Sequence, residues 1–251
     1  MTELALKLGR SDARLIGRDR FLISLFAFVV LIAIVLRFGM PWLNTYLADN
    51  GVMPGKTIPM SLAGIYPMLV AYMAIYSGAL MVGTVFGFVL LDEKDHNTLK
   101  AMLVTPVPIS QYALYRIALP VALTFVVVVA QVLFINQAMV PLWQLLLLSA
   151  GAALTAPIVT LFFATVAENK VAGFAYSKFG GSAGMLIMIG FFVPEPWQWL
   201  FGLFPPFWVS KAYWMAFEGR GLWWAVLAGG VILQIGMIRW FLGRFTKVAH
   251  R

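Results

Sequence analysis

The stretch IYPMLVAYMAIYSGALMVGTVFGFVLLDEKD, residues 65–95, has no charged residue before Asp92 and then has four in succession. A helix of about 20 apolar residues crosses the roughly 30 Å hydrocarbon core of a bilayer, so residues 65–91 are long enough to span it. The rest of the chain agrees, because 62% of its 251 residues are hydrophobic and only 11% are charged. This composition excludes an ordinary water-soluble domain and predicts an all-α integral membrane protein.

Uncharged runs on either side of this stretch predict five more membrane spans, six in total. The first covers residues 21–36, and Arg37 at its end has a side chain long enough to reach the interface. No charged residue lies between Arg116 and Glu168, an interval too long for one helix, and the turn-forming residues of 136–141 predict a tight hairpin between spans three and four. The fifth and sixth spans are expected over residues 172–193 and 222–242.

The basic residues predict the orientation, since cytoplasmic loops carry an excess of Lys and Arg. Fourteen of the 18 basic residues fall on the side of the two termini, and only Arg37, Lys56, Lys211 and Arg220 fall on the other. We therefore predict a multi-pass protein of the cell membrane with both termini in the cytoplasm. The net charge of +8 then reports topology and contact with anionic membrane lipids, and no nucleic-acid partner is expected. Cysteine is absent, so thiolate metal sites are excluded, and we predict no metal site.

Two segments outside the spans have patterns of their own. In residues 1–20, Leu8 and Leu15 share one face of a possible helix, and Arg10 and Arg14 lie on the other. This favours an amphipathic helix along the membrane surface, and a charged tail that sets the orientation is the alternative. Residues 194–221 are apolar, but their four prolines prevent one long helix. We expect a broken, partly re-entrant helical pair on the outer side, with an exposed aromatic loop as the alternative.

Two stretches look like catalytic motifs. GVMPGKT, residues 51–57, has three residues between its glycines where a nucleotide-binding loop needs four, and it is predicted to lie outside the cell. GGSAG, residues 180–184, matches a serine-hydrolase pattern, with Lys178 four residues before Ser182. An intramembrane hydrolase using Ser182 and Lys178 is one alternative, but glycines four apart favour close helix packing, as do Gly83 and Gly87. We predict no catalytic residue, so the chain is not expected to be an enzyme.

Four charged residues, 92–95, end the second span, and HNTLKAMLV, residues 96–104, then predicts a short amphipathic helix within the region 92–108. Its acidic start suits the positive end of a helix dipole, and Leu99 and Met102 lie toward one side. Pro106 and Pro108 end it. Such a helix, joined stiffly to two spans, is a suitable handle for a partner protein, and an interfacial connector is the alternative.

The stretch LLDEKDHNTLKAMLVTPVPISQYALYR, residues 90–116, and the six-span plan resemble the membrane subunit of ABC-2-type transporters, in particular permeases described as fluoroquinolone exporters. The resemblance covers nearly the whole chain and implies one transmembrane domain, residues 1–251, with a type V ABC exporter-like fold. In that family the helix after span two, called the coupling helix, docks on a separately encoded ATPase that binds ATP and Mg²⁺. The contacts implied here are Asp92, Glu93, Lys94, Asp95, Thr98, Leu99, Met102 and Pro106.

The resemblance also implies a mechanism. Two copies of the chain would pair with two ATPase subunits, whose closure on ATP would move the coupling helices and shift the spans between inward- and outward-facing arrangements. The chain itself would hold no cofactor. The absence of acidic residues in the middle of the spans suits a hydrophobic or amphipathic cargo, such as a drug or lipid. A membrane scaffold without transport remains an alternative. Side chains expected along the substrate pathway, or else in ordinary packing, are Tyr72, Tyr76, Met81, Met185, Met188 and Phe191.

Overall fold

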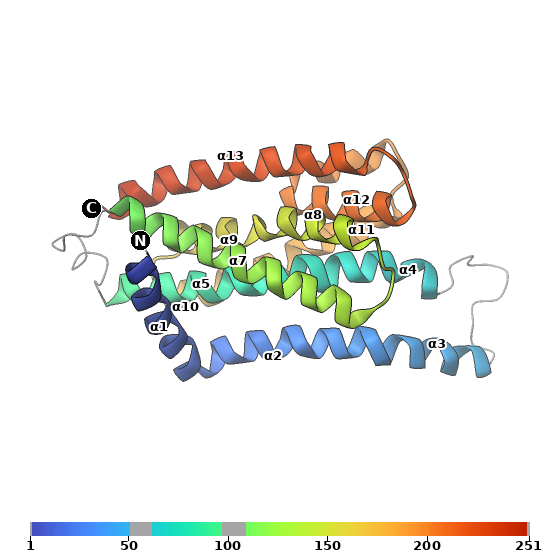
Figure 1. Cartoon of the computed structure of the whole chain (residues 1–251), viewed down its shortest axis with the longest axis horizontal. Coiled ribbons are helices and arrows are strands. Elements are labelled where there is room, and N and C mark those ends of the chain that lie inside the picture. Colours follow the sequence, from blue (N-terminus) through green and yellow to red (C-terminus); the bar gives the residue numbers. More distant parts are fainter. Residues whose placement is uncertain (1, 51–61, 97–108, 250–251) are drawn as a thin grey trace.

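The computed structural model describes residues 2–50, 62–96 and 109–249, and these ranges consist of helices and short connections, with no strand (Figure 1). The GVMPGKT motif and residues 97–108 lie outside them. Long helices run side by side along the molecule, and α1 lies across one end. Within the described ranges, five helical stretches are long and apolar enough to cross a membrane, which confirms a multi-pass helical protein. They are Arg20–Leu47, Gly64–Asp95, Gln111–Ile135, Leu142–Val166 and Trp223–Phe245.

The first stretch is longer than expected. After α1 (Thr2–Arg18), the Asp19 side chain accepts hydrogen bonds from the backbone N–H groups of Phe21 and Leu22 and so caps α2 (Arg20–Ile34). The chain continues through a π-helix, Val35–Gly39, into α3 (Met40–Asp49). Arg37 does not end the helix, because its guanidinium donates to the backbone carbonyl of Phe134 and lies 5.0 Å from the centre of that ring. The helix can therefore pass Arg37 without exposing an unpaired charge to lipid.

The quoted stretch forms the centre of the bundle. It begins as α4 (Leu62–Leu69), continues as a π-helix, Val70–Tyr76, and ends as α5 (Ser77–Asp95), which is buried along most of its length. Gly83 and Gly87 let α5 approach α9 closely, as expected. A Cβ atom at Gly83 would lie 2.7 Å from the carbonyl oxygen of Ala156, and one at Gly87 would lie 2.7 Å from the Phe163 ring.

The predicted hairpin between spans three and four is present. It joins α7 (Ile109–Ile135) to α8 (Leu142–Ala153), which leads directly into α9 (Thr155–Val166). Asn136 and Ala138 have positive φ values of 53° and 49°, which turn the chain back on itself. The Tyr213 hydroxyl donates to the Ala138 carbonyl at 2.6 Å and fixes the turn against a later helix.

The fifth predicted span is divided into α10 (Lys170–Ala183) and α11 (Met185–Phe192), which meet at Gly184. Neither helix alone is long enough to cross a membrane, so the count of six spans is not confirmed. The last predicted span corresponds to α13 (Trp223–Ala249).

Residues 194–221 contain two helices separated by a break. A 3₁₀-helix, Trp197–Leu203, precedes α12 (Pro205–Phe217), and Pro205 and Pro206 occupy the first turn of α12, where a missing N–H group costs nothing. Most of α12 is buried, which differs from the exposed aromatic loop that was the alternative interpretation. That the pair re-enters a membrane from the outer side stays a prediction.

Candidate functional site at the ends of three helices

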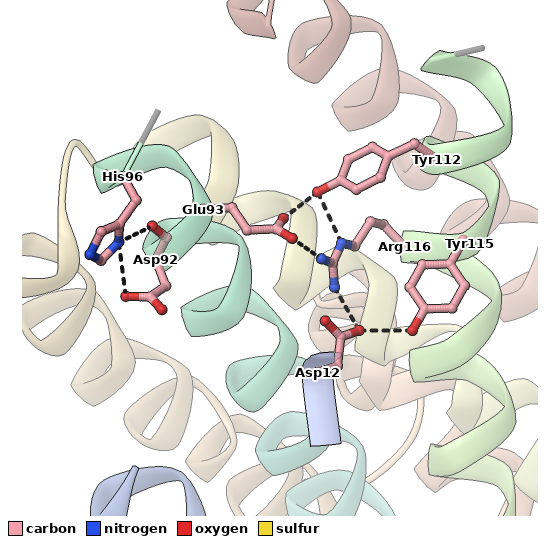
Figure 2. A network of polar contacts seen from close by, with 7 residues as sticks. All are labelled: Asp12, Asp92, Glu93, His96, Tyr112, Tyr115 and Arg116. Atoms are coloured by element: carbon pink, nitrogen blue, oxygen red, sulfur yellow. Dashed lines mark hydrogen bonds and ion pairs between the residues drawn. The ribbon is translucent and has the colours of Figure 1, made fainter. Parts of the chain in front are cut away.

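A buried group of charged and hydroxyl side chains joins the ends of three helices (Figure 2). Asp12 comes from α1, Glu93 comes from the last turn of α5, and Tyr112, Tyr115 and Arg116 come from the first turns of α7. We call these five residues the Arg116 cluster. Arg116 is 1% exposed and Asp12 is 2% exposed, so water cannot solvate their charges. Ionised groups buried this deeply need partners inside the protein.

The cluster satisfies every nitrogen of the Arg116 guanidinium. Nη1 donates to Asp12 Oδ2 at 2.9 Å, Nη2 pairs with Glu93 Oε1, and Nε donates to the Tyr112 hydroxyl at 3.0 Å. The two tyrosines complete the network, since Tyr112 donates to Glu93 and Tyr115 donates to Asp12 at 2.8 Å. The planar fork of an arginine suits two carboxylates in this way. One cation thus ties α1, α5 and α7 together.

The position of the cluster along the chain gives it functional interest. Glu93 lies just before residues 97–108 and Arg116 lies just after them, so the ion pair joins the two helices that flank the predicted coupling segment. Asp12 adds α1 to the same pair. A displacement of α5 or of α7 would therefore be transmitted to the other helix and to α1.

The neighbouring charged residues tie the end of α5 to the connection between α9 and α10. Lys170 Nζ pairs with Asp92 Oδ1 at 2.6 Å, and Lys94 Nζ donates to the backbone carbonyl of Ala167 at 2.9 Å. His96 Nδ1 lies 2.8 Å from the Asp92 carbonyl oxygen (Figure 2). Of the acidic residues expected to contact an ATPase, Glu93 and Asp92 are engaged within the chain.

Of the predicted contact residues that the structure describes, Asp95 is the exposed one, and the backbone N–H group of Lys170 donates to its carboxylate over a long distance of 3.4 Å. Thr98, Leu99, Met102 and Pro106 lie outside the described residues. The contact of these side chains with an ATPase therefore stays a prediction. Sequence reasoning missed the rest of the cluster, although Tyr112 and Arg116 are four residues apart and so share one helical face.

The predicted substrate pathway falls on the contact between the second span and α10 to α11. Tyr72 and Tyr76 stack with ring centres 6.2 Å apart, and the Tyr76 hydroxyl donates to the Gly180 carbonyl at 2.6 Å. A Cβ atom at Gly184 would lie 2.6 Å from the Tyr72 ring. Met81, Met188 and Phe191 pack on the main core, whereas Met185 is exposed.

A partly open pocket of about 280 Å³ lies beside this contact, between α5, α9, α10 and α13. Its lining is mainly aromatic and aliphatic, and Tyr76 is the member that sequence reasoning had proposed. The other members come from helices far apart in the sequence, so no local pattern could have brought them together. A pocket of this size suits a small molecule.

The GGSAG segment contributes to packing. The Ser182 hydroxyl donates to the Phe179 carbonyl at 3.0 Å, within its own helix, and both Ser182 and Lys178 are exposed. A Cβ atom at Gly180 would lie 2.9 Å from Leu80, so this glycine allows close contact with α5. The geometry favours the packing interpretation over a hydrolase.

Comparison with known proteins gives a family and two relatives. The profile of the family described as "Fluoroquinolones export permease protein Rv2686c-like" matches residues 12–242. The chain is 29% identical over 249 residues to the fluoroquinolones export permease proteins Rv2686c and MT2760 of two Mycobacterium tuberculosis strains, H37Rv and CDC 1551. Each match covers 96% of this chain and 93% of the relative. No solved structure matches the chain.

Proposed function

Because the chain belongs to the Rv2686c-like family of fluoroquinolones export permease proteins, we propose that it is the membrane-spanning permease subunit of an ATP-driven ABC exporter. The observation that carries this proposal is the family match over residues 12–242, which includes four of the five apolar helices and most of the fifth. The cargo is a hydrophobic or amphipathic molecule, drug-like or lipid-like, and fluoroquinolones are candidates because they appear in the relatives' names.

The subunit works as a pair of copies with two separately encoded ATPase subunits, which bind ATP and Mg²⁺. The one further span, the fifth along the chain, is α10 and α11 taken together, because their 14 and 8 residues, with Gly184 between them, reach about 34 Å at 1.5 Å per residue. Both termini lie in the cytoplasm, and so do residues 92–108. This arrangement is supported by the excess of basic residues on that side.

Residues 92–108 receive the movement of the ATPase and pass it to the spans. The Arg116 cluster supports this step, since Glu93 and Arg116 link the two helices that flank the segment. A push on the segment therefore moves α5 and α7 as one unit, and Asp12 carries the movement to α1. The pair of permeases then exchanges inward- and outward-facing arrangements, and hydrolysis on the ATPase resets them.

The test is an affinity pull-down of the tagged, detergent-solubilised chain from its native host. The variant combines Asp95→Arg with Leu99→Asp, because Asp95 is exposed and its change leaves the Arg116 cluster intact. Asp49→Arg is the matched control, since Asp49 is also exposed but lies at the end of α3, at the opposite end of the bundle (Figure 1).

We expect an ATPase subunit to co-purify with the wild type and with Asp49→Arg, and to be lost from the double variant. If no ATPase co-purifies with any form, the exporter assignment fails. If it binds all three forms equally, the chain has an ATPase partner but residues 92–108 are not its docking element.

A further inference from the structure

The pocket between α5, α9, α10 and α13 has a chemistry that narrows the class of cargo. Aromatic rings reach it from several elements, including Phe162 on α9, Tyr176 on α10, Phe204 before α12 and Phe241 on α13. Among the residues that the structure describes, no charged one lines it. In a membrane, an ionised ligand would lose its hydration here without meeting a counter-charge.

The hydroxyl groups in the lining are mostly engaged. Tyr76 donates to the Gly180 carbonyl, Thr155 donates to Gln234 at 3.0 Å, and Ser177 donates to the Phe174 carbonyl at 2.8 Å. Tyr176 lines the pocket, and its hydroxyl makes no hydrogen bond to any residue in ranges 2–50, 62–96 and 109–249. One donor is therefore available to a ligand.

We propose that this pocket binds an uncharged, ring-containing molecule that carries a hydrogen-bond acceptor for Tyr176. The inference rests on the proposed function and names the substrate class of the exporter. The site is formed within one copy of the chain. Of the candidate fluoroquinolones, only the uncharged form fits this class, because an ionised carboxylate would meet no counter-charge in the pocket.

The lining favours a compact aromatic guest over a lipid acyl chain. The rings already meet edge to face, with Phe162 5.8 Å from Tyr176 and 6.3 Å from Phe241, centre to centre. An aromatic guest extends this arrangement, because ring edges and faces carry opposite partial charges. An acyl chain would gain no such contact and would leave the Tyr176 donor unused.

Benzophenone is the probe that tests the proposal, because it is uncharged, has two phenyl rings and a carbonyl acceptor, and cross-links to nearby C–H bonds on illumination. The whole chain is reconstituted in phosphatidylcholine nanodiscs, illuminated with benzophenone, and digested, and the labelled peptides are mapped by mass spectrometry. We expect saturable labelling on α9, α10 and α13, around Phe162, Tyr176 and Met237.

Two variants and one control locate the label. Ala183→Phe fills the pocket from α10 and should abolish labelling there, whereas Ala175→Phe on the same helix makes the same change at an exposed position and should not. Tyr176→Phe keeps the ring and removes the donor, so the half-saturating benzophenone concentration should rise about five-fold, the value of one ordinary hydrogen bond. Diphenylmethane, which lacks the carbonyl, should compete equally well with the wild type and with Tyr176→Phe.

Several results would overturn the proposal. Labelling spread over the exposed faces of α2 and unchanged in Ala183→Phe would mean that benzophenone only dissolves in lipid. Labelling of the pocket in detergent but not in nanodiscs would mean that acyl chains occupy it. Competition by diphenylacetate, which is ionised at pH 7, at concentrations similar to those of diphenylmethane would contradict the requirement for an uncharged ligand.

The failure of this inference can be told apart from failure of the proposed function. Photolabelling uses the chain without an ATPase, and the pull-down uses no ligand. An ATPase that co-purifies with both wild type and Ala183→Phe, together with scattered labelling, would leave the exporter in place and remove the pocket as its cargo site.

Discussion

Arg116 on α7 and Asp12 on α1 form a buried ion pair of 2.9 Å across 104 positions of sequence. The same guanidinium pairs with Glu93 at the end of α5, so two carboxylates share one cation. In a site that water does not reach, the loss of the cation leaves two negative charges close together. The contact between the ends of the three helices therefore depends more on Arg116 than on either carboxylate.

Replacement of Arg116 by Met should lower the free energy of unfolding by about 3–5 kcal/mol, the usual cost of breaking a buried pair from one side. Asp12→Asn should lower the free energy of unfolding by less, because Arg116 still pairs with Glu93. Both can be followed by thermal unfolding in detergent, read from tryptophan fluorescence. Arg14→Met is the control, since Arg14 lies on α1 together with Asp12 but is exposed.

A triple variant makes this prediction sharper. When Arg116→Met is combined with Asp12→Asn and Glu93→Gln, no buried charge remains, and replacement of a whole buried ion cluster is often close to neutral. Much of the lost stability should then return. Equal melting temperatures for Arg116→Met and Arg14→Met would show instead that the cluster contributes nothing to stability.

Gly184→Ala should disturb the junction of α10 and α11, because its new methyl group would overlap the stacked rings of Tyr72 and Tyr76. Overpacking of this kind costs about 1–3 kcal/mol. Gly181→Ala adds the same methyl group where nothing lies within 4 Å, and should be neutral or stabilising. Melting temperatures of the two variants check the prediction, and an unchanged Gly184→Ala protein would contradict the close contact.

The sequence was a good guide to the helices, because lipid imposes a minimum apolar length that can be read without a partner. Its errors lie where a tertiary contact overrides a local signal. Arg37 should have ended the first span, but the carbonyl of Phe134, in the last turn of α7, accepts a hydrogen bond from its guanidinium, and the helix continues to Leu47. The fifth span is divided at Gly184, where two tyrosine rings occupy the space that a side chain would take.

The candidate site was much harder to predict. Arg116 looks like one more basic residue near a span end, and Glu93 looks like one charge in an acidic run. Their pairing with Asp12 joins positions that no helical period relates, since it depends on how α1 crosses the ends of α5 and α7. The pocket could not be predicted for the same reason. In the sequence its aromatic residues look like ordinary core residues, and they come together only where four helices meet.

The orientation can be tested with cysteine labelling, because the natural chain has no cysteine and offers no background. Asp49→Cys at the end of α3 should react with a membrane-impermeant maleimide in intact cells. Glu168→Cys, between α9 and α10, should react only after permeabilisation. Both positions are exposed, at opposite ends of the bundle (Figure 1). The reverse pattern would place the termini outside, and labelling of both in intact cells would contradict the arrangement of spans.

Glu195 offers a test of the outer segment by pH. Hydrogen bonds from Lys211 and then Arg220 lower the pKa of Glu195 below its ordinary value of 4.5. A carboxyl group with a lowered pKa in the folded state stabilises the protein above its unfolded pKa, and this stabilisation is lost as the pH falls through the folded pKa. At pH 7, Glu195→Gln should therefore be less stable than the wild type, by about 1 kcal/mol because the side chain is 41% exposed.

The difference between wild type and Glu195→Gln should stay constant from pH 7 down to about 5 and shrink below 4.5, as the wild-type carboxyl takes up its proton. Tryptophan fluorescence during thermal unfolding measures it at each pH. Glu218→Gln is the control, because Glu218 is more exposed and lies 3.7 Å from Arg220 without contacting the buried Lys211. A difference that persists undiminished at the lowest pH would mean that Glu195 acts through its shape and hydrogen bonds, and that its charge does not hold Lys211 in place.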